Sequence, residues 1–97
     1  MRLVLHPVVY SDIDKIMEYY ETSATAQLAD DFYIELRGFM AEALKRPTSF
    51  SIRERDLRRV NLERFPYHFL FRVAGDGVRV LVVRHHSRHP SFGMWRR

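Results

Sequence analysis

The spacing of apolar residues changes from a helical to a strand period near the middle of the chain, which restricts it to a fold of both helices and strands. Residues 25–46, which end before Pro47, carry an apolar stripe with steps of three or four, typical of an amphipathic helix. The stripe consists of Leu28, Phe32, Leu36, Phe39 and Ala43. Residues 58–62, 67–73 and 78–86 are instead rich in β-branched and aromatic residues, which favours three strands.

The first 25 residues predict a short strand and a first helix. Residues 2–6 form the expected strand, which Pro7 stops. The helix is expected to open at Ser11, with Asp14 three residues later as the partner in a capping box. Apolar and aromatic residues follow at helical spacing up to Tyr20, and the expected break lies at residues 21–23. The longer helix then starts near Thr25.

The element order is therefore strand, helix, helix and three strands (β-α-α-β-β-β). Two helices joined by a short break should form an antiparallel hairpin. We expect an α+β fold in which this helical hairpin covers one face of a small antiparallel sheet, leaving the other face available for a partner. A chain of 97 residues that is 46% hydrophobic is expected to form one domain over residues 1–97.

The turn at residues 74–77 joins the last two strands and is compatible with two registers. A two-residue turn at residues 76–77 places His68 and His86 on opposite faces of the sheet. A three-residue turn at residues 75–77, with a bulge at Gly77, places four candidate site residues on one face. These are His68, Arg72, Arg84 and His86. Both strands are apolar on both faces, so the sequence leaves both registers open.

The charge is distributed unevenly along the chain. Residues 1–50 contain five Lys/Arg and eight Asp/Glu, a net charge of −3. Residues 51–97 contain eleven arginines, no lysine and four Asp/Glu, a net charge of +7. Arginine binds carboxylate or phosphate groups with two hydrogen bonds. The basic half therefore predicts an acidic partner, which is either a nucleic acid or an acidic protein segment.

Other features limit the classes of function. The chain has no cysteine, which excludes disulfides and cysteine-ligated zinc and suits a cytoplasmic protein. Its first apolar run is too short for a signal peptide or a membrane span, so we expect no membrane association. His85 and His86 point to opposite faces of a strand and chelate poorly, so we expect no metal. We also expect no cofactor, because neither a glycine-rich phosphate loop nor a nucleophile elbow occurs.

The ordered set of segments resembles the RelE/ParE superfamily of toxins over nearly the whole chain, and within it the ParE-like branch. Residues 58–73 combine an arginine-containing strand, the turn Phe65-Pro66-Tyr67 and an aromatic strand that ends in Phe71-Arg72-Val73. Residues 80–88 resemble the ParE ending, in which apolar residues precede a histidine and an arginine. The start of the chain, from His6-Pro7 to Tyr20, also fits the first helix of this family.

The resemblance implies the toxin of a type II toxin–antitoxin system, which inhibits growth until a cognate antitoxin neutralises it in a hetero-oligomer. ParE-like toxins poison DNA gyrase by binding, whereas RelE-like toxins cut messenger RNA on the ribosome. Both activities occur on the same fold, so the fold alone does not show which activity a protein has. We expect binding to DNA gyrase, and the alternative is a ribosome-dependent mRNA endonuclease. A basic nucleic-acid-binding module without toxicity fits the family resemblance less well.

A nuclease would need a base, an acid and cations around the phosphate. The candidates for these roles are Arg84, His86, Arg88 and His68. Arg84 and His86 correspond to a late arginine and histidine of the nuclease branch. The strands of the second half lack lysine, however, and Ser87 stands where some nucleases have tyrosine, which favours binding. A hydrogen bond to a neighbouring residue is the simpler interpretation of His86.

A second set of side chains is expected to contact partners: Arg59, Arg72, Arg84, Arg88 and Trp95. The last ten residues mix arginine with Phe92 and Trp95, a combination that suits base stacking or anchoring on a protein. An equally good interpretation is a tail that folds its aromatic residues back onto the sheet.

Overall fold

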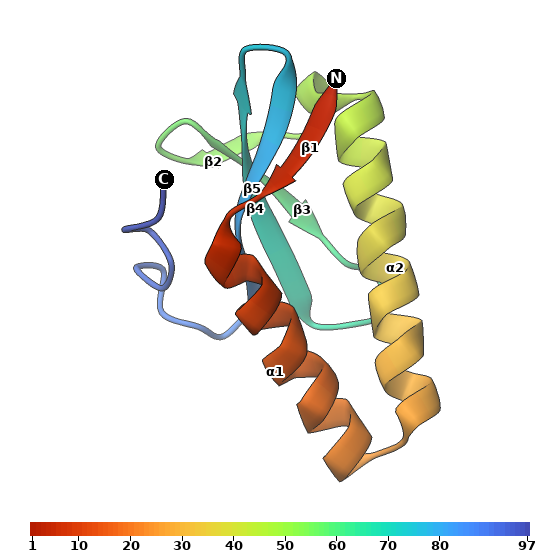
Figure 1. The fold of residues 1–97 in the computed structure, drawn as a ribbon. Coiled ribbons are helices and arrows are strands. Elements are labelled where there is room, and N and C mark those ends of the chain that lie inside the picture. The colour runs from red at the N-terminus through yellow and green to blue at the C-terminus, as the bar shows by residue number, and fades with distance from the viewer.

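The computed structural model describes residues 1–97, and its elements lie within a few residues of most predicted ranges. In chain order they are β1 (Arg2–Leu5), α1 (Pro7–Ser23), α2 (Ala26–Lys45), the 3-10 turn η1 (Pro47–Ser49), β2 (Ile52–Glu54), β3 (Leu57–Asn61), β4 (Tyr67–Ala74) and β5 (Gly77–His85). The two helices lie on one side of the sheet and the C-terminal tail lies on the other (Figure 1). No helix combines the length and apolar character that a membrane span needs.

The sheet has five strands in the order β1-β5-β4-β3-β2. Strands β2 to β5 pair antiparallel, as expected, but β1 pairs parallel with β5. The α+β fold is confirmed, while the prediction of a purely antiparallel sheet is wrong for β1. Strand β2 was not predicted, because three residues are too few to show an alternating pattern.

Helix α1 begins at Pro7 rather than at Ser11, so the predicted capping box is wrong. His6 is the N-cap, and its Nδ1 accepts a hydrogen bond of 3.1 Å from the backbone N–H of Val8. Proline fits the first helical position because its fixed φ suits the helix and its missing N–H has no partner there. Strand β1 therefore passes into α1 with only His6 between them.

Helix α1 also continues through Ser23, so the predicted break at residues 21–23 is wrong. The break is Ala24-Thr25, and Thr25 Oγ1 accepts a hydrogen bond of 3.0 Å from Leu28 N. The predicted start of the second helix near Thr25 is confirmed. Its end at Lys45, before Pro47, is also confirmed.

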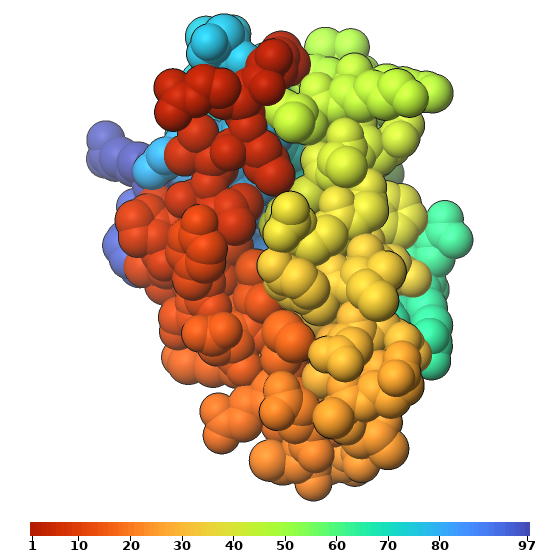
Figure 2. Space-filling view, turned by 45° about the vertical axis from the view of Figure 1, so that its right-hand side comes forward, coloured from red at the N-terminus to blue at the C-terminus, as the bar shows by residue number.

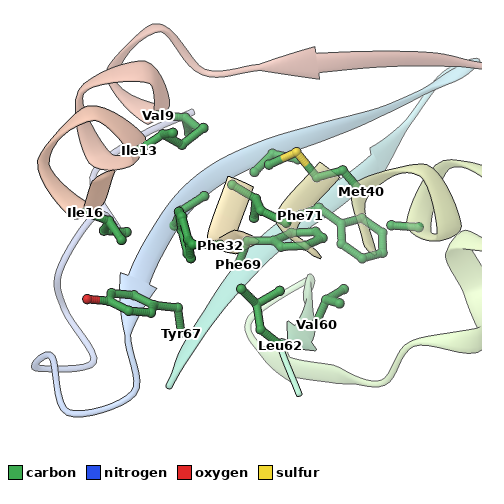
Figure 3. Packing of buried hydrophobic residues seen from close by; sticks show 14 of the residues in the cluster. Val9, Ile13, Ile16, Phe32, Met40, Val60, Leu62, Tyr67, Phe69 and Phe71 are labelled. Carbon is green, nitrogen blue, oxygen red and sulfur yellow. The ribbon is translucent and has the colours of Figure 1, made fainter. Parts of the chain in front are cut away.

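The main hydrophobic core lies between the helical hairpin and the sheet (Figure 3). Phe32 and Leu36 of α2 are fully buried there, as the helical stripe predicted. Leu28 and Phe39 are only partly buried, and Met40 is buried instead. Figure 2 views the side on which α1 and α2 lie against each other.

A second, smaller apolar cluster lies on the opposite face of the sheet. Leu57, Leu70, Leu81 and Val82 pack there against Phe92 and Met94 of the tail. The expectation that this face stays open is therefore wrong where the tail covers it. The interpretation in which tail aromatics fold back onto the sheet is correct for Phe92.

Neither predicted register of the β4–β5 hairpin is correct as stated. Ala74 pairs with Gly77, so the two-residue loop is Gly75-Asp76, and Gly75 has a φ of 59°. Further along, the register shifts, because Leu70 pairs with Val82 while Phe71 pairs with Val80. Leu81 is the extra residue, and a single extra residue reverses which face the following side chains occupy.

The bulge at Leu81 decides the composition of the site. Beyond it His68 pairs with Arg84, which places both side chains on the face that the tail covers. His86 follows directly after β5 and contacts His68 on the same face. His68, Arg84 and His86 thus lie on one face, as the three-residue turn predicted. The structure reaches this arrangement with a two-residue turn and a bulge at Leu81.

Candidate functional site

Four side chains from three neighbouring strands and the residue after β5 form a hydrogen-bonded cluster on the tail side of the sheet. We call Arg59, His68, Arg84 and His86 the histidine cluster. The Nδ1 atoms of His68 and His86 lie 2.9 Å apart, and their rings are nearly parallel, with centroids 5.2 Å apart. Arg84 Nε donates to His68 Nε2 at 2.9 Å, and Arg59 Nη2 lies 3.4 Å from His86 Nδ1.

The donors of the two arginines define the protonation of the two imidazoles. Arginine N–H groups only donate, so His68 Nε2 must accept and the proton of His68 lies on Nδ1. That proton points to His86 Nδ1, which also faces Arg59 and therefore acts as an acceptor. The proton of a neutral His86 lies on its outer Nε2. Each imidazole is thus held in one neutral tautomer.

Burial and positive charge both oppose protonation of this pair. His68 is only 1% exposed, and burial, followed by the charges of Arg59 and Arg84, lowers its pKa to about 3. Burial, Arg59 and His85 also lower the pKa of His86 below its ordinary value. Neither imidazole is therefore mainly a cation at neutral pH, which leaves less of the protonated form that a general acid uses.

Arg84 uses all of its hydrogen-bond donors within the protein. Its Nη1 donates to the carbonyl oxygens of Pro90 and Phe92, both at 2.9 Å. Its Nη2 donates to the two carboxylate oxygens of Glu54 at 2.9 and 3.0 Å. With Nε on His68, all three nitrogens of this 3% exposed residue have partners within the protein. Arg84 therefore joins β5 to β2 and to the tail and has no donor left for a phosphate.

A buried ion pair that no sequence pattern predicted lies at the edge of β5, beyond the last residue that pairs with β1. Arg96 of the tail donates to both oxygens of Asp12 from α1, at 2.6 and 3.0 Å. The same pair takes up two backbone groups of β5, because Asp12 accepts from Val83 N and Arg96 donates to Leu81 O. The two residues are 84 positions apart, so no local sequence pattern predicts the contact.

The residues predicted to contact partners do not form one site. Arg59 and Arg84 belong to the histidine cluster, whereas Arg72 forms a two-point ion pair with Asp56. Arg88 is exposed, with its guanidinium 4.6 Å from the ring centroid of Phe92. Trp95 is 69% exposed, and its ring meets the ring of His6 edge-on at 5.9 Å.

An apolar groove lies between α1, α2 and the edge strand β1, and we call it the helix groove. It has a volume of about 330 Å³. Seven of its nine lining residues are hydrophobic: Leu3, Leu5, Tyr10, Ile13, Met17, Tyr33 and Met40. Asp14 and Arg37 complete the lining. Such a groove fits an apolar face of a peptide, with the unpaired edge of β1 beside it.

The comparisons with known proteins agree with this architecture. Residues 3–90 match a family model described as "ParE toxin of type II toxin-antitoxin system, parDE". A solved structure described as the chromosomal ParDE TA system from P. aeruginosa is similar in fold, with a TM-score of 0.79 and 19% sequence identity. The match covers 88% of this chain and 95% of that one. The comparison with curated proteins gives no match.

Proposed function

Because the chain belongs to the family of ParE toxins of type II toxin–antitoxin systems, we propose that it inhibits growth by binding DNA gyrase and not by cutting RNA. Residues 1–97 act as one toxin domain in the cytoplasm, where gyrase works on the chromosome. Membership of the family implies an antitoxin partner, with which the toxin forms a hetero-oligomer.

The hydrogen bonds and the lowered pKa values of the histidine cluster are the observations that favour binding over cleavage. A nuclease needs a cation beside the scissile phosphate and an imidazole that can give up a proton. Arg84 has its donors engaged by Glu54, His68 and the tail. The low pKa of His68 and the lowered pKa of His86 keep both imidazoles neutral. These features support a structural role for the cluster, which ties β5 to the tail.

The side chains left for a target lie around the cluster and along the tail. Arg59 is partly exposed beside His86, and Arg88 and Trp95 are exposed. Arg72 and Arg84 already have carboxylate partners. We therefore assign contact with the target to Arg59, Arg88 and Trp95, and we assign a structural role to Arg84.

The antitoxin is proposed to be acidic and to place an apolar segment in the helix groove. Tyr10 at the groove is 59% exposed, and seven hydrophobic residues line a concave surface that water otherwise covers. The net charge of +7 in residues 51–97 supports an acidic part of the antitoxin that lies outside the groove and faces the basic side, since complementary charge raises the rate and specificity of association. The tail occupies much of the sheet face, which favours the helix groove as the main anchor.

Expression of the toxin without its antitoxin tests the proposal in cells. A reporter of the DNA-damage response and a map of messenger RNA 5′ ends are recorded in the same arrested culture. Binding to gyrase predicts induction of the reporter and intact messenger RNA. Cleavage within codons of translated messenger RNA, with a silent reporter, would instead establish the ribosome-dependent nuclease.

A further inference from the structure

The charges of the chain are divided between its two layers. Residues 7–45, which form α1 and α2, contain three Lys/Arg and eight Asp/Glu, a net charge of −5. Residues 46–97, which form β2 to β5 and the tail, contain twelve arginines and four Asp/Glu, a net charge of +8. The tail lies across the sheet from the helices (Figure 1). The molecule therefore presents an acidic helix side and a basic tail side.

A groove of about 580 Å³ on the basic side runs between the β2–β3 turn and the tail, and we call it the tail groove. Leu57, Leu81 and Met94 provide apolar lining. The remaining lining residues are polar or aromatic: Arg55, Arg72, Ser91, Trp95, Arg96 and Arg97. The lining contains no carboxylate and no amide side chain. It thus offers positive charge beside apolar surface.

Three arginines in or beside this groove have no Asp or Glu partner. Arg72 and Arg96 are paired with aspartates, but Arg55, Arg79 and Arg97 are in no ion pair. Arg79 lies beside the end of the groove, because its Nε and Nη2 donate to the main-chain oxygen of Arg97 at 3.0 and 2.8 Å. No acidic side chain neutralises these three guanidinium groups, and the main chain of Arg97 holds Arg79 at the end of the groove.

The backbone of Arg55 adds a second observation. Its φ of 55° is in the left-handed region, which a residue with a side chain adopts at a cost in free energy. Glycine would relieve this strain, yet the turn carries an arginine. The Arg55 side chain reaches the tail, with Nη1 3.5 Å from Met94 O. The strained turn thus holds a guanidinium at the tail groove.

Trp95 supplies an aromatic surface among these charges. It is the single tryptophan of the chain and is 69% exposed. The ring of His6 contacts it edge-on, and the buried guanidinium of Arg96 lies 5.7 Å from its ring centroid. Its orientation is therefore held from within the protein while most of its surface faces water. Exposed aromatic rings between cations are typical platforms for unstacked bases.

We propose that the tail groove binds an unpaired nucleic acid strand, with one base stacked on Trp95 and the phosphates held by Arg55, Arg79 and Arg97. Binding through stacking and through charge on the phosphates tolerates any base sequence. An acidic peptide would match the charge but would leave the exposed indole without a stacking partner. The inference is independent of gyrase as the target.

Fluorescein-labelled dT20 and rU20 test the inference by anisotropy with the full chain. Three phosphate contacts predict a slope of about −2 in a plot of log affinity against log salt concentration. Stacking on the single tryptophan predicts quenching of its emission when unlabelled dT20 saturates the protein. The two strands should bind within about threefold of each other, and polyglutamate of equal charge should bind more than about tenfold more weakly.

Two double charge-reversal variants distinguish binding at the tail groove from attraction to the net charge of the whole molecule. Arg55→Glu with Arg97→Glu should weaken dT20 binding by more than about tenfold and flatten the salt slope by about 1.4. Lys45→Glu with Arg64→Glu changes the net charge equally, at exposed positions on α2 and on the β3–β4 loop that contacts α2. This control should weaken binding by less than about threefold. Trp95→Ala should weaken binding by about tenfold, and Trp95→Phe should restore much of it.

Three outcomes would overturn the inference. One is tryptophan emission that stays unchanged at saturation, because the base would then not stack. Another is equal weakening by the two pairs of reversals, which would reveal attraction to the whole molecule. The third is polyglutamate that binds as tightly as dT20, which would identify the tail groove as a site for an acidic protein segment. Thermal unfolding of each variant confirms that the exposed substitutions leave the fold intact.

Discussion

The Nδ1 atoms of His68 and His86 lie 2.9 Å apart, and Arg84 and Arg59 approach the two rings from either end. This chain of hydrogen bonds needs both imidazoles to be neutral. If His86 carried a proton on Nδ1, its N–H group would point at the N–H group of His68. The pair therefore acts as a rigid connection between β4, β5 and β3, and its chemistry is tested by the first two predictions.

We predict that His86→Gln remains toxic. In a binding toxin one exposed contact such as His86 contributes less than about 1 kcal/mol, which is under tenfold in affinity and is masked by overexpression. Loss of a general acid would instead slow a nuclease by about 100- to 10,000-fold. The measurement is colony formation after induction without antitoxin, with soluble protein compared on blots. A folded but harmless His86→Gln variant would favour the nuclease.

The pH dependence of stability should report the low pKa of His68. The unfolded chain protonates this imidazole below about pH 6.5, whereas the folded chain does so only at about pH 3. Protonation therefore favours unfolding, so the contribution of His68 is complete above pH 6.5 and is lost as the pH falls. Between pH 6.5 and 5 we expect a loss of about 1–2 kcal/mol in the free energy of unfolding.

Urea unfolding of the parent and of His68→Gln at several pH values measures this effect. The substituted protein is less stable at pH 7, and its stability should change less over the same interval. Parallel pH profiles for the two proteins would contradict the assigned protonation of the pair.

Arg84→Ala should destabilise the protein by about 3 kcal/mol, because it leaves Glu54, His68 and two tail carbonyls without their donor. The matched control is Arg72→Ala. Arg72 also forms a two-point ion pair, but with a carboxylate that is 58% exposed, so its loss should cost less than about 1 kcal/mol. Equal losses in urea unfolding would contradict the role of Arg84 as the connection between the sheet and the tail.

The antitoxin interaction should depend on Tyr10 but not on Tyr19. Both tyrosines are on α1 and are similarly exposed, at 59% and 57%, yet only Tyr10 lines the helix groove. We expect Tyr10→Ala to weaken binding by about 30-fold and Tyr19→Ala by less than about fivefold. Calorimetry with the antitoxin encoded beside the toxin measures both values.

The association rate of the same two proteins should fall as salt rises, because the basic half attracts an acidic partner. Stopped-flow mixing at low and high salt measures this rate. A rate that does not change with salt would show that the antitoxin is not recruited by charge.

The long elements of this fold were predictable because their patterns extend over many residues. The stripe of α2 and the apolar runs of β4 and β5 each repeat often enough to identify their type. The start of α1 was predicted wrongly at Ser11, although a proline directly after a polar residue favours the first helical position. The three residues of β2 carry no such pattern.

The site was less predictable, because it depends on one inserted residue and on distant contacts. The bulge at Leu81 moves Arg84 to the face of His68, and nothing in the apolar run 80–83 indicates where the extra residue lies. The pairing of Asp12 with Arg96 joins the first helix to the tail. Such contacts follow from the assembled fold and not from local spacing.

Supercoiling by purified DNA gyrase is the measurement that tests the central proposal most directly. Relaxed plasmid, gyrase and ATP are incubated with increasing toxin, with and without the antitoxin. We predict that the toxin blocks supercoiling, that the antitoxin restores it, and that His86→Gln blocks it within about tenfold of the parent concentration. Full supercoiling at saturating toxin, together with cleavage of messenger RNA in a translating extract, would contradict the proposal.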